Sequence, residues 1–147
     1  MPIEDGVDFN GITITNHGKR TKHKTIEDAL KSNDINILYP TILPNNISVT
    51  DIMLFEKDSK NKIIYFYSDP NLHSEISLNT QLSKAVKNGA SEKTTINSID
   101  CYICKMPDMQ LVQIEFEFNG NYYMFTHTDK DILIEIIENL EEINNEN

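Results

Sequence analysis

The segment LVQIEFEFNGNYYMFTHT, residues 111 to 128, constrains the fold more tightly than any other part of this sequence. Apolar and polar residues alternate along its first half, as they do in a strand that has one buried face. Asn119 and Gly120 follow, and Asn-Gly is a preferred two-residue hairpin turn. The segment therefore predicts a hairpin with one face in the core and the other in water. The expected cross-strand pairs are Phe116 with Tyr123 and Ile114 with Phe125.

Five further segments have the composition and spacing of strands, and polar turns separate them. They are residues 11 to 15, 47 to 56, 62 to 68, 75 to 83 and 96 to 106. The second and third flank a polar turn and are predicted to form a hairpin. In the fourth, Ile76, Leu78 and Leu82 are expected to face one way. Residues 83 to 95 are polar, contain Asn-Gly-Ala and are predicted as a loop.

Two segments have the spacing of amphipathic helices. Residues 25 to 33 begin with Thr25, which can cap a helix, and Asp28 completes a capping-box pattern. The second helix is predicted at residues 129 to 142, and either Thr128 or Asp129 can cap it. The apolar side of this second helix consists of Ile132, Leu133, Ile136, Ile137 and Leu140.

An apolar run lies between the predicted helix at residues 25 to 33 and the predicted strand at residues 47 to 56. Two prolines interrupt it, in the segment YPTILP at residues 39 to 44. Proline lacks the N–H group that a central strand must donate, and it pushes the preceding residue into extended geometry. The segment is therefore predicted as an extended connector that leads into the sheet. Tyr39, Ile42 and Leu43 are expected to hold it to the core.

These elements predict an α+β fold with an antiparallel six- or seven-stranded meander sheet, a short N-terminal helix and a C-terminal amphipathic helix. Residues 11 to 143 are expected to form one domain, after a flexible arm at residues 1 to 10 and before a frayed tail at residues 144 to 147. Two short helices cannot cover both faces of such a sheet. One face is therefore expected to be partly open or curled on itself.

The charge of the chain limits its partners. The 147 residues carry a formal net charge of -10, which argues against non-specific binding to nucleic acid or to an anionic membrane. A basic cluster at residues 17 to 24 is expected to be a solvated loop. No segment approaches the roughly 18 apolar residues that a membrane span requires. The start of the sequence lacks the features of a signal peptide, so the chain is expected to be cytosolic or to have lost an anchor or signal.

The groups that could support chemistry are sparse. Cys101 and Cys104 lie on a predicted strand, on opposite faces and about 10 Å apart, so they are expected to be unlinked. Glu115 and Glu117 could form a carboxylate pair, but the solvent face of a strand explains them better. The histidines, His17, His23, His73 and His127, have no metal-binding spacing. We therefore expect no catalytic, metal-binding or cofactor-binding residues.

One set of aromatic residues permits two interpretations. Neighbours on a strand point to opposite faces, so these aromatics cannot all lie in one core layer. Either the sheet curls and packs both faces, or one face forms a concave apolar surface for a ligand or peptide. The set is Tyr65, Phe66, Tyr67, Tyr122, Tyr123 and Phe125.

The order of four motifs over residues 25 to 142 resembles an uncharacterised family of extracytoplasmic domains from low-G+C Gram-positive bacteria. The motifs are TIEDALKSNDINILYPTILP, IIYFYSD, TTINSIDCYI and FEFNGNYYMFTHTDKDILIEIIENL. The third departs from the family in having Ser98 where glycine is usual. Family members are often C-terminal parts of membrane-anchored proteins, and some follow an anti-sigma-factor zinc module. The resemblance implies a sensory or binding module and no catalytic residues.

We therefore expect a monomeric, non-catalytic extracytoplasmic sensor or protein-interaction domain of a bacterial cell-envelope protein. The alternative is a carrier-like domain that binds an apolar ligand or lipid on the open face of the sheet. The expected partner is a protein or a small apolar ligand, without nucleic acid or cofactor, and with membrane contact only through a missing anchor. If no anchor or signal was lost, the expected compartment is the cytoplasm.

Overall fold

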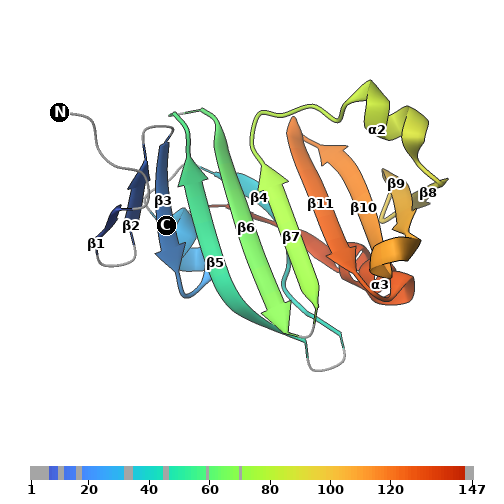
Figure 1. The fold of residues 1–147 in the computed structure, drawn as a ribbon, viewed down its shortest axis with the longest axis horizontal. Helices are drawn as coiled ribbons and strands as arrows, with labels where there is room; N and C mark the ends of the chain where they lie inside the picture. Colours follow the sequence, from blue (N-terminus) through green and yellow to red (C-terminus); the bar gives the residue numbers. More distant parts are fainter. Residues whose placement is uncertain are drawn as a thin grey trace.

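The computed structural model describes residues 7–9, 12–15, 18–31, 35–44, 47–58, 60–69 and 71–144. Within these ranges one antiparallel sheet holds ten strands in the order β1-β2-β3-β5-β6-β7-β11-β10-β9-β8 (Figure 1). The first five are β1 Val7–Phe9, β2 Ile12–Thr15, β3 Gly18–His23, β5 Ser48–Glu56 and β6 Lys62–Asp69. The others are β7 Leu72–Ser77, β8 Glu92–Ile96, β9 Ile99–Met106, β10 Leu111–Phe118 and β11 Asn121–His127.

The antiparallel α+β architecture is confirmed, but the predicted number of six or seven strands is wrong. In the order across the sheet, the eight strands that begin with β3 and end with β8 form its body. The short strands β1 and β2 extend the edge beside β3. Two strands of the body were missed because their sequences are polar. The basic cluster predicted as a loop contains β3. The predicted loop at residues 83 to 95 contains the helix α2, Lys84–Gly89, and all of β8 except its last residue.

The hairpin at residues 111 to 128 has the predicted register. Phe116 pairs with Tyr123, and Ile114 pairs with Phe125. Asn119 and Gly120 have φ values of 50° and 78°, as a two-residue hairpin turn of this type requires. A second turn of the same kind, at Asn97 and Ser98, joins β8 to β9, so the strand predicted at residues 96 to 106 begins at Ile99.

A second layer covers one face of the sheet. It consists of helix α1 Ile26–Leu30, helix α3 Lys130–Glu138 and a two-stranded sheet of β4 Asn36–Pro40 and β12 Leu140–Asn144. In Figure 1 the large sheet faces the viewer, and β4 passes behind β6 and β7. Thr25 caps α1 as predicted, because its Oγ1 accepts a hydrogen bond of 3.1 Å from the Asp28 N–H.

The second layer also corrects three predictions. The C-terminal helix ends at Glu138 instead of residue 142, and β12 follows it. The proline segment is not only a connector, because its first two residues, Tyr39 and Pro40, form the end of β4, which pairs along β12. This pairing suits prolines, since β4 is outside the large sheet. Ile42 does not hold the segment to the core, as 67% of it is exposed, whereas Tyr39 is buried.

The core lies between the two layers. Its largest fully buried side chains are Phe66, Phe116, Tyr123 and Phe125. The hydroxyl of Tyr123 accepts a hydrogen bond of 2.9 Å from the Leu38 N–H. The Asn121 side-chain amide donates one of 3.2 Å to the Asn36 carbonyl. These two bonds fix β4 against β11.

The strand predicted at residues 75 to 83 starts and ends earlier, at Leu72 and Ser77. Ile76, Leu78 and Leu82 are all buried, but the last two lie beyond the strand. The chain then crosses to α2, which with β9 and β10 lines a depression of about 300 Å³. The helix therefore covers part of the second face of the sheet. Cys101 and Cys104, on β9, are free thiols as predicted.

Candidate functional site

The part of the second face that α2 does not cover carries a cluster of apolar and aromatic side chains. We call it the open-face patch. It comprises Met53, Phe55, Tyr65, Tyr67, Tyr122 and Met124, which lie on β5, β6 and β11. Each of these residues is at least partly exposed, and Tyr67 is 45% exposed. Strand periodicity places them on one face, because their neighbours in sequence point into the core.

The aromatic set is divided between the two faces. Phe66, Tyr123 and Phe125 are fully buried in the core, whereas Tyr65, Tyr67 and Tyr122 lie on the open face. The ring of Tyr67 stacks on His73 at 4.8 Å with an interplanar angle of 2°. Burial lowers the pKa of His73, so this imidazole is neutral at physiological pH.

One end of the patch has basic and acidic groups at its rim. The Arg20 guanidinium lies 5.7 Å from the centre of the Phe55 ring, a cation–π distance. Lys22 forms an exposed ion pair of 3.1 Å with Asp51. Arg20, Met53, Tyr65 and Tyr67 line a depression of about 170 Å³. This end of the patch can therefore accept a small apolar or aromatic group.

The other end of the patch is acidic. Glu75 and Glu115 flank Met124 in the strand register, and Glu115 is 7% exposed. The Tyr122 hydroxyl donates a hydrogen bond to the Glu115 carboxylate. Burial and this bond raise the pKa of Tyr122. The phenol therefore stays protonated and remains the donor of this hydrogen bond.

In the described part of the chain, Glu115, Glu117 and His127, which were considered for catalysis or metal binding, make hydrogen bonds within the fold. Glu115 is bonded to Tyr122, and Glu117 accepts a hydrogen bond of 3.4 Å from the Leu82 N–H. His127 is buried and accepts a hydrogen bond from the Asp129 N–H. No three metal-binding side chains gather in the part of the chain that is described, and His17 lies outside it.

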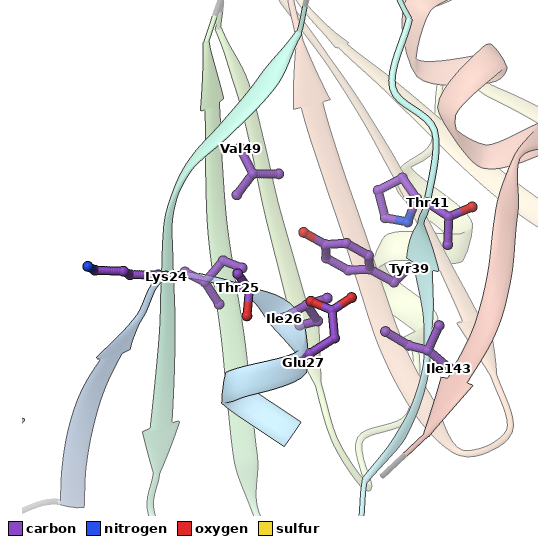
Figure 2. Close-up of a pocket in the computed structure, with 10 residues that line it drawn as sticks. Lys24, Thr25, Ile26, Glu27, Tyr39, Thr41, Val49 and Ile143 are labelled. Atoms are coloured by element: carbon purple, nitrogen blue, oxygen red, sulfur yellow. The ribbon is translucent and has the colours of Figure 1, made fainter. Parts of the chain in front are cut away.

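A second candidate lies at the edge of the core, on the side of the covering layer. We call it the interlayer cleft (Figure 2). It has a volume of about 280 Å³ and lies between α1, β4, β12 and the start of β5. Its walls are formed by Lys24, Thr25, Ile26, Glu27, Tyr39, Pro40, Thr41, Val49, Ile52 and Ile143.

Tyr39 is the central polar residue of the interlayer cleft. Its ring packs at 5.1 Å from that of Phe66, and the residue is only 7% exposed. Its hydroxyl points from β4 toward β5 in Figure 2. Burial, and secondarily the negative charge of Glu27, raises the pKa of Tyr39 to about 12. The phenol is therefore a neutral hydroxyl at physiological pH.

Sequence reasoning placed Tyr39 in the core but did not find the cleft. The cleft exists because β4 pairs with β12, which brings Tyr39 close to Ile143. These residues lie about a hundred positions apart, and no local pattern signals their contact. By contrast, the open-face patch follows from strand alternation, which the sequence shows directly.

A protein family described as a domain of unknown function, DUF4367, matches residues 40–140. The chain belongs to the DUF4367 family. The DUF4367 match runs from the end of β4 to the start of β12. It contains the whole open-face patch, while α1 and Ile143 of the interlayer cleft lie outside it. The resemblance seen in the sequence is thus confirmed as far as an uncharacterised domain family.

No curated protein and no solved structure matches the chain significantly. Among the helices that the structure describes, none is long and apolar enough to cross a membrane.

Proposed function

We propose that this DUF4367 domain is a non-catalytic protein-interaction domain that docks a partner protein on its open-face patch. The observation that carries the proposal is the patch itself. Aromatic and methionine side chains from three strands gather there on the part of the second face that α2 leaves uncovered. Tyrosine and methionine are enriched at protein interfaces, because they combine apolar contact with hydrogen bonding or adaptable packing.

The shape of the surface supports an interaction domain over the carrier alternative. A carrier encloses most of the surface of its ligand. The depressions beside Tyr65 and beside α2 measure about 170 and 300 Å³ and are open to solvent. A shallow surface of this kind suits a protein partner. One side chain of the partner can fill a small depression, while the flat surfaces around the depression contact each other.

The polar groups around the patch support a specific interface. The stacked Tyr67 and His73 rings hold each other in place, and Arg20 lies over Phe55. Rigid aromatic groups lose little conformational entropy when a partner binds. The extracytoplasmic compartment and the sensory role are part of the proposal and rest on the sequence resemblance described above.

The test is proximity cross-linking of the tagged full-length protein in its native cells, followed by quantitative mass spectrometry. Three forms are compared: wild type, Tyr67→Glu and Met109→Glu. Met109 is the matched control, because it is also an exposed apolar residue, 65% exposed, and lies on a different surface.

We expect one protein to be enriched equally by wild type and Met109→Glu and to fall by about tenfold or more with Tyr67→Glu. Equal recovery by all three forms would show that the patch is not the interface. Denaturation midpoints of the three proteins establish that each is folded. Fractionation of the same cells tests the compartment separately.

A further inference from the structure

The interlayer cleft offers a site that the proposed interaction surface does not use. It lies on the opposite side of the large sheet from the open-face patch. Its walls are mostly apolar, with Ile26, Val49 and Ile143 facing the space between α1 and β4 (Figure 2). An apolar hollow with a few polar groups is the usual form of a small-ligand site.

Most polar groups of the cleft are already engaged or point away. The Thr25 hydroxyl accepts the N-cap hydrogen bond from Asp28. The Thr41 hydroxyl donates a hydrogen bond of 3.2 Å to Glu141. Figure 2 shows the Lys24 ammonium directed away from the other lining residues. The polar groups that can bind a ligand in the cleft therefore belong to two other residues.

Those residues are Tyr39 and Glu27. The Tyr39 hydroxyl makes no hydrogen bond to any residue that the structure describes, and although the residue as a whole is buried, its oxygen is not among the fully buried polar atoms. The Glu27 carboxylate likewise forms no ion pair or hydrogen bond within the described ranges, and it acts electrostatically on Tyr39. The Tyr39 hydroxyl therefore has free hydrogen-bonding capacity at the wall of the cleft, where a ligand can bond to it.

We propose that the interlayer cleft binds a primary alkylammonium group. The ammonium would donate one hydrogen bond to the Glu27 carboxylate and another to the Tyr39 oxygen, while its alkyl chain contacts Val49, Ile26 and Ile143. A cation is favoured over an anion, because the carboxylate would repel a negative ligand and the chain has a net charge of -10.

Two sources can supply this chemistry: a free alkylamine and the lysine side chain of a peptide. Both fit the cleft, which measures about 280 Å³, because a five-carbon amine has only six heavy atoms. With so few atoms and a solvent-exposed carboxylate, the expected dissociation constant is on the order of 1 mM.

The test is an amide chemical-shift titration of the full chain with n-pentylamine at neutral pH and low salt. The matched probes are 1-pentanol, which lacks the charge, and pentanoate, which reverses it. We expect pentylamine to shift the amides of Thr25, Ile26 and Val49 and to bind about tenfold more tightly than either probe. Equal or tighter binding of pentanol or pentanoate would overturn the proposal.

Three variants identify the residues. We expect Glu27→Gln to weaken pentylamine binding by about tenfold and Tyr39→Phe by about threefold. Glu135→Gln, an exposed carboxylate on α3, should change nothing. Unchanged affinity in Glu27→Gln would refute the assignment. All three side-chain changes are conservative, and denaturation midpoints verify that the proteins remain folded.

The source of the ammonium is tested with a lysine whose backbone amine is acetylated and whose carboxyl is an amide. Binding that matches pentylamine assigns the cleft to a lysine side chain, and binding of pentylamine alone assigns it to a free amine. Tyr67→Glu should leave both affinities unchanged. The cleft and the open-face patch can thus fail independently.

Discussion

Ser74 lies in the middle of the core, between Phe66 of β6 and Phe125 of β11 in the strand register. It is fully buried, and its hydroxyl has no hydrogen-bond partner in the described structure. Burial of an unbonded hydroxyl costs about 1–3 kcal/mol. The residue therefore lowers the stability of the native state.

We predict that Ser74→Ala raises the free energy of unfolding by about 1 kcal/mol, because it removes the unbonded hydroxyl and keeps the small side chain. Urea denaturation measures the change. Thr25→Ala is the opposite case, since its hydroxyl caps α1. It should lower the free energy of unfolding by about 1 kcal/mol. A destabilised Ser74→Ala protein would mean that the hydroxyl has a partner.

A second comparison concerns two buried tyrosines. The Tyr123 hydroxyl accepts a hydrogen bond from the Leu38 N–H, while that of Tyr39 bonds to no described residue. Tyr123→Phe leaves a buried N–H unpaired, so we predict a loss of about 1–3 kcal/mol in the free energy of unfolding. Tyr39→Phe should cost less than about 0.5 kcal/mol. Equal losses in the two variants would contradict this account.

At the scale of elements, two hairpin turns of the same kind differ in sequence. Asn97 and Ser98 join β8 to β9 with φ values of 53° and 62°, and Asn119 and Gly120 join β10 to β11. A left-handed backbone costs a serine roughly 1 kcal/mol and a glycine almost nothing. Ser98 is therefore a strained choice at a position suited to glycine.

We predict that Ser98→Gly raises the free energy of unfolding by about 0.5–1 kcal/mol and that Gly120→Ser lowers it by a similar amount. A Cβ atom on Gly120 would meet nothing within 4 Å, so backbone strain alone produces the loss. Thermal or urea denaturation of both variants checks the pair. Changes of the same sign would show that the turns are not equivalent.

The hairpins were predictable because each depends on residues close in sequence. Alternation and the Asn-Gly dipeptide define β10 and β11, and the same logic gave the β5–β6 hairpin. The missed elements lack such signals. β3 is mostly basic, α2 is a short polar helix, and β12 is rich in glutamate and continues a helical pattern. Tertiary contact decides the structure of such segments.

The two candidate sites differ in the same way: local sequence predicts one of them, and contacts between distant segments form the other. The open-face patch was anticipated as one of two alternatives, because alternation alone places Tyr65 and Phe66 on opposite faces. The interlayer cleft was not anticipated, because its walls come from segments near both ends of the chain. Even Tyr39, which was expected in the core, gave no indication that its hydroxyl lacks a partner.

At the scale of the whole molecule, burial perturbs several weak acids in one direction. It raises the pKa of the Cys101 thiol from 9.0 to about 12, and that of Tyr39 from 10.0 to about 12. The pKa values of Tyr122 and Tyr123 are raised as well. In the unfolded chain these groups lose their protons at lower pH than in the native protein.

Stability should therefore fall in alkali. Above pH 9 the unfolded chain binds fewer protons than the native state, so the free energy of unfolding decreases as pH rises. We predict a decline that begins near pH 9, steepens above pH 10 and continues toward pH 12. Urea denaturation at a series of pH values measures it. Cys101→Ala should remove the part of the decline between pH 9 and 10, and an unchanged slope there would refute the role of the thiol.

The pairing of β4 with β12 also determines the order in which the chain can fold. Residues 36 to 40 precede their partner, residues 140 to 144, in the sequence and therefore leave the ribosome before it. Through that interval β4 is an unpaired apolar strand, the kind of segment that promotes aggregation. Pro40, the last residue of β4, limits its pairing with other strands, because it cannot donate a backbone hydrogen bond. This proline thus restricts incorrect pairing of β4 until β12 has been synthesised.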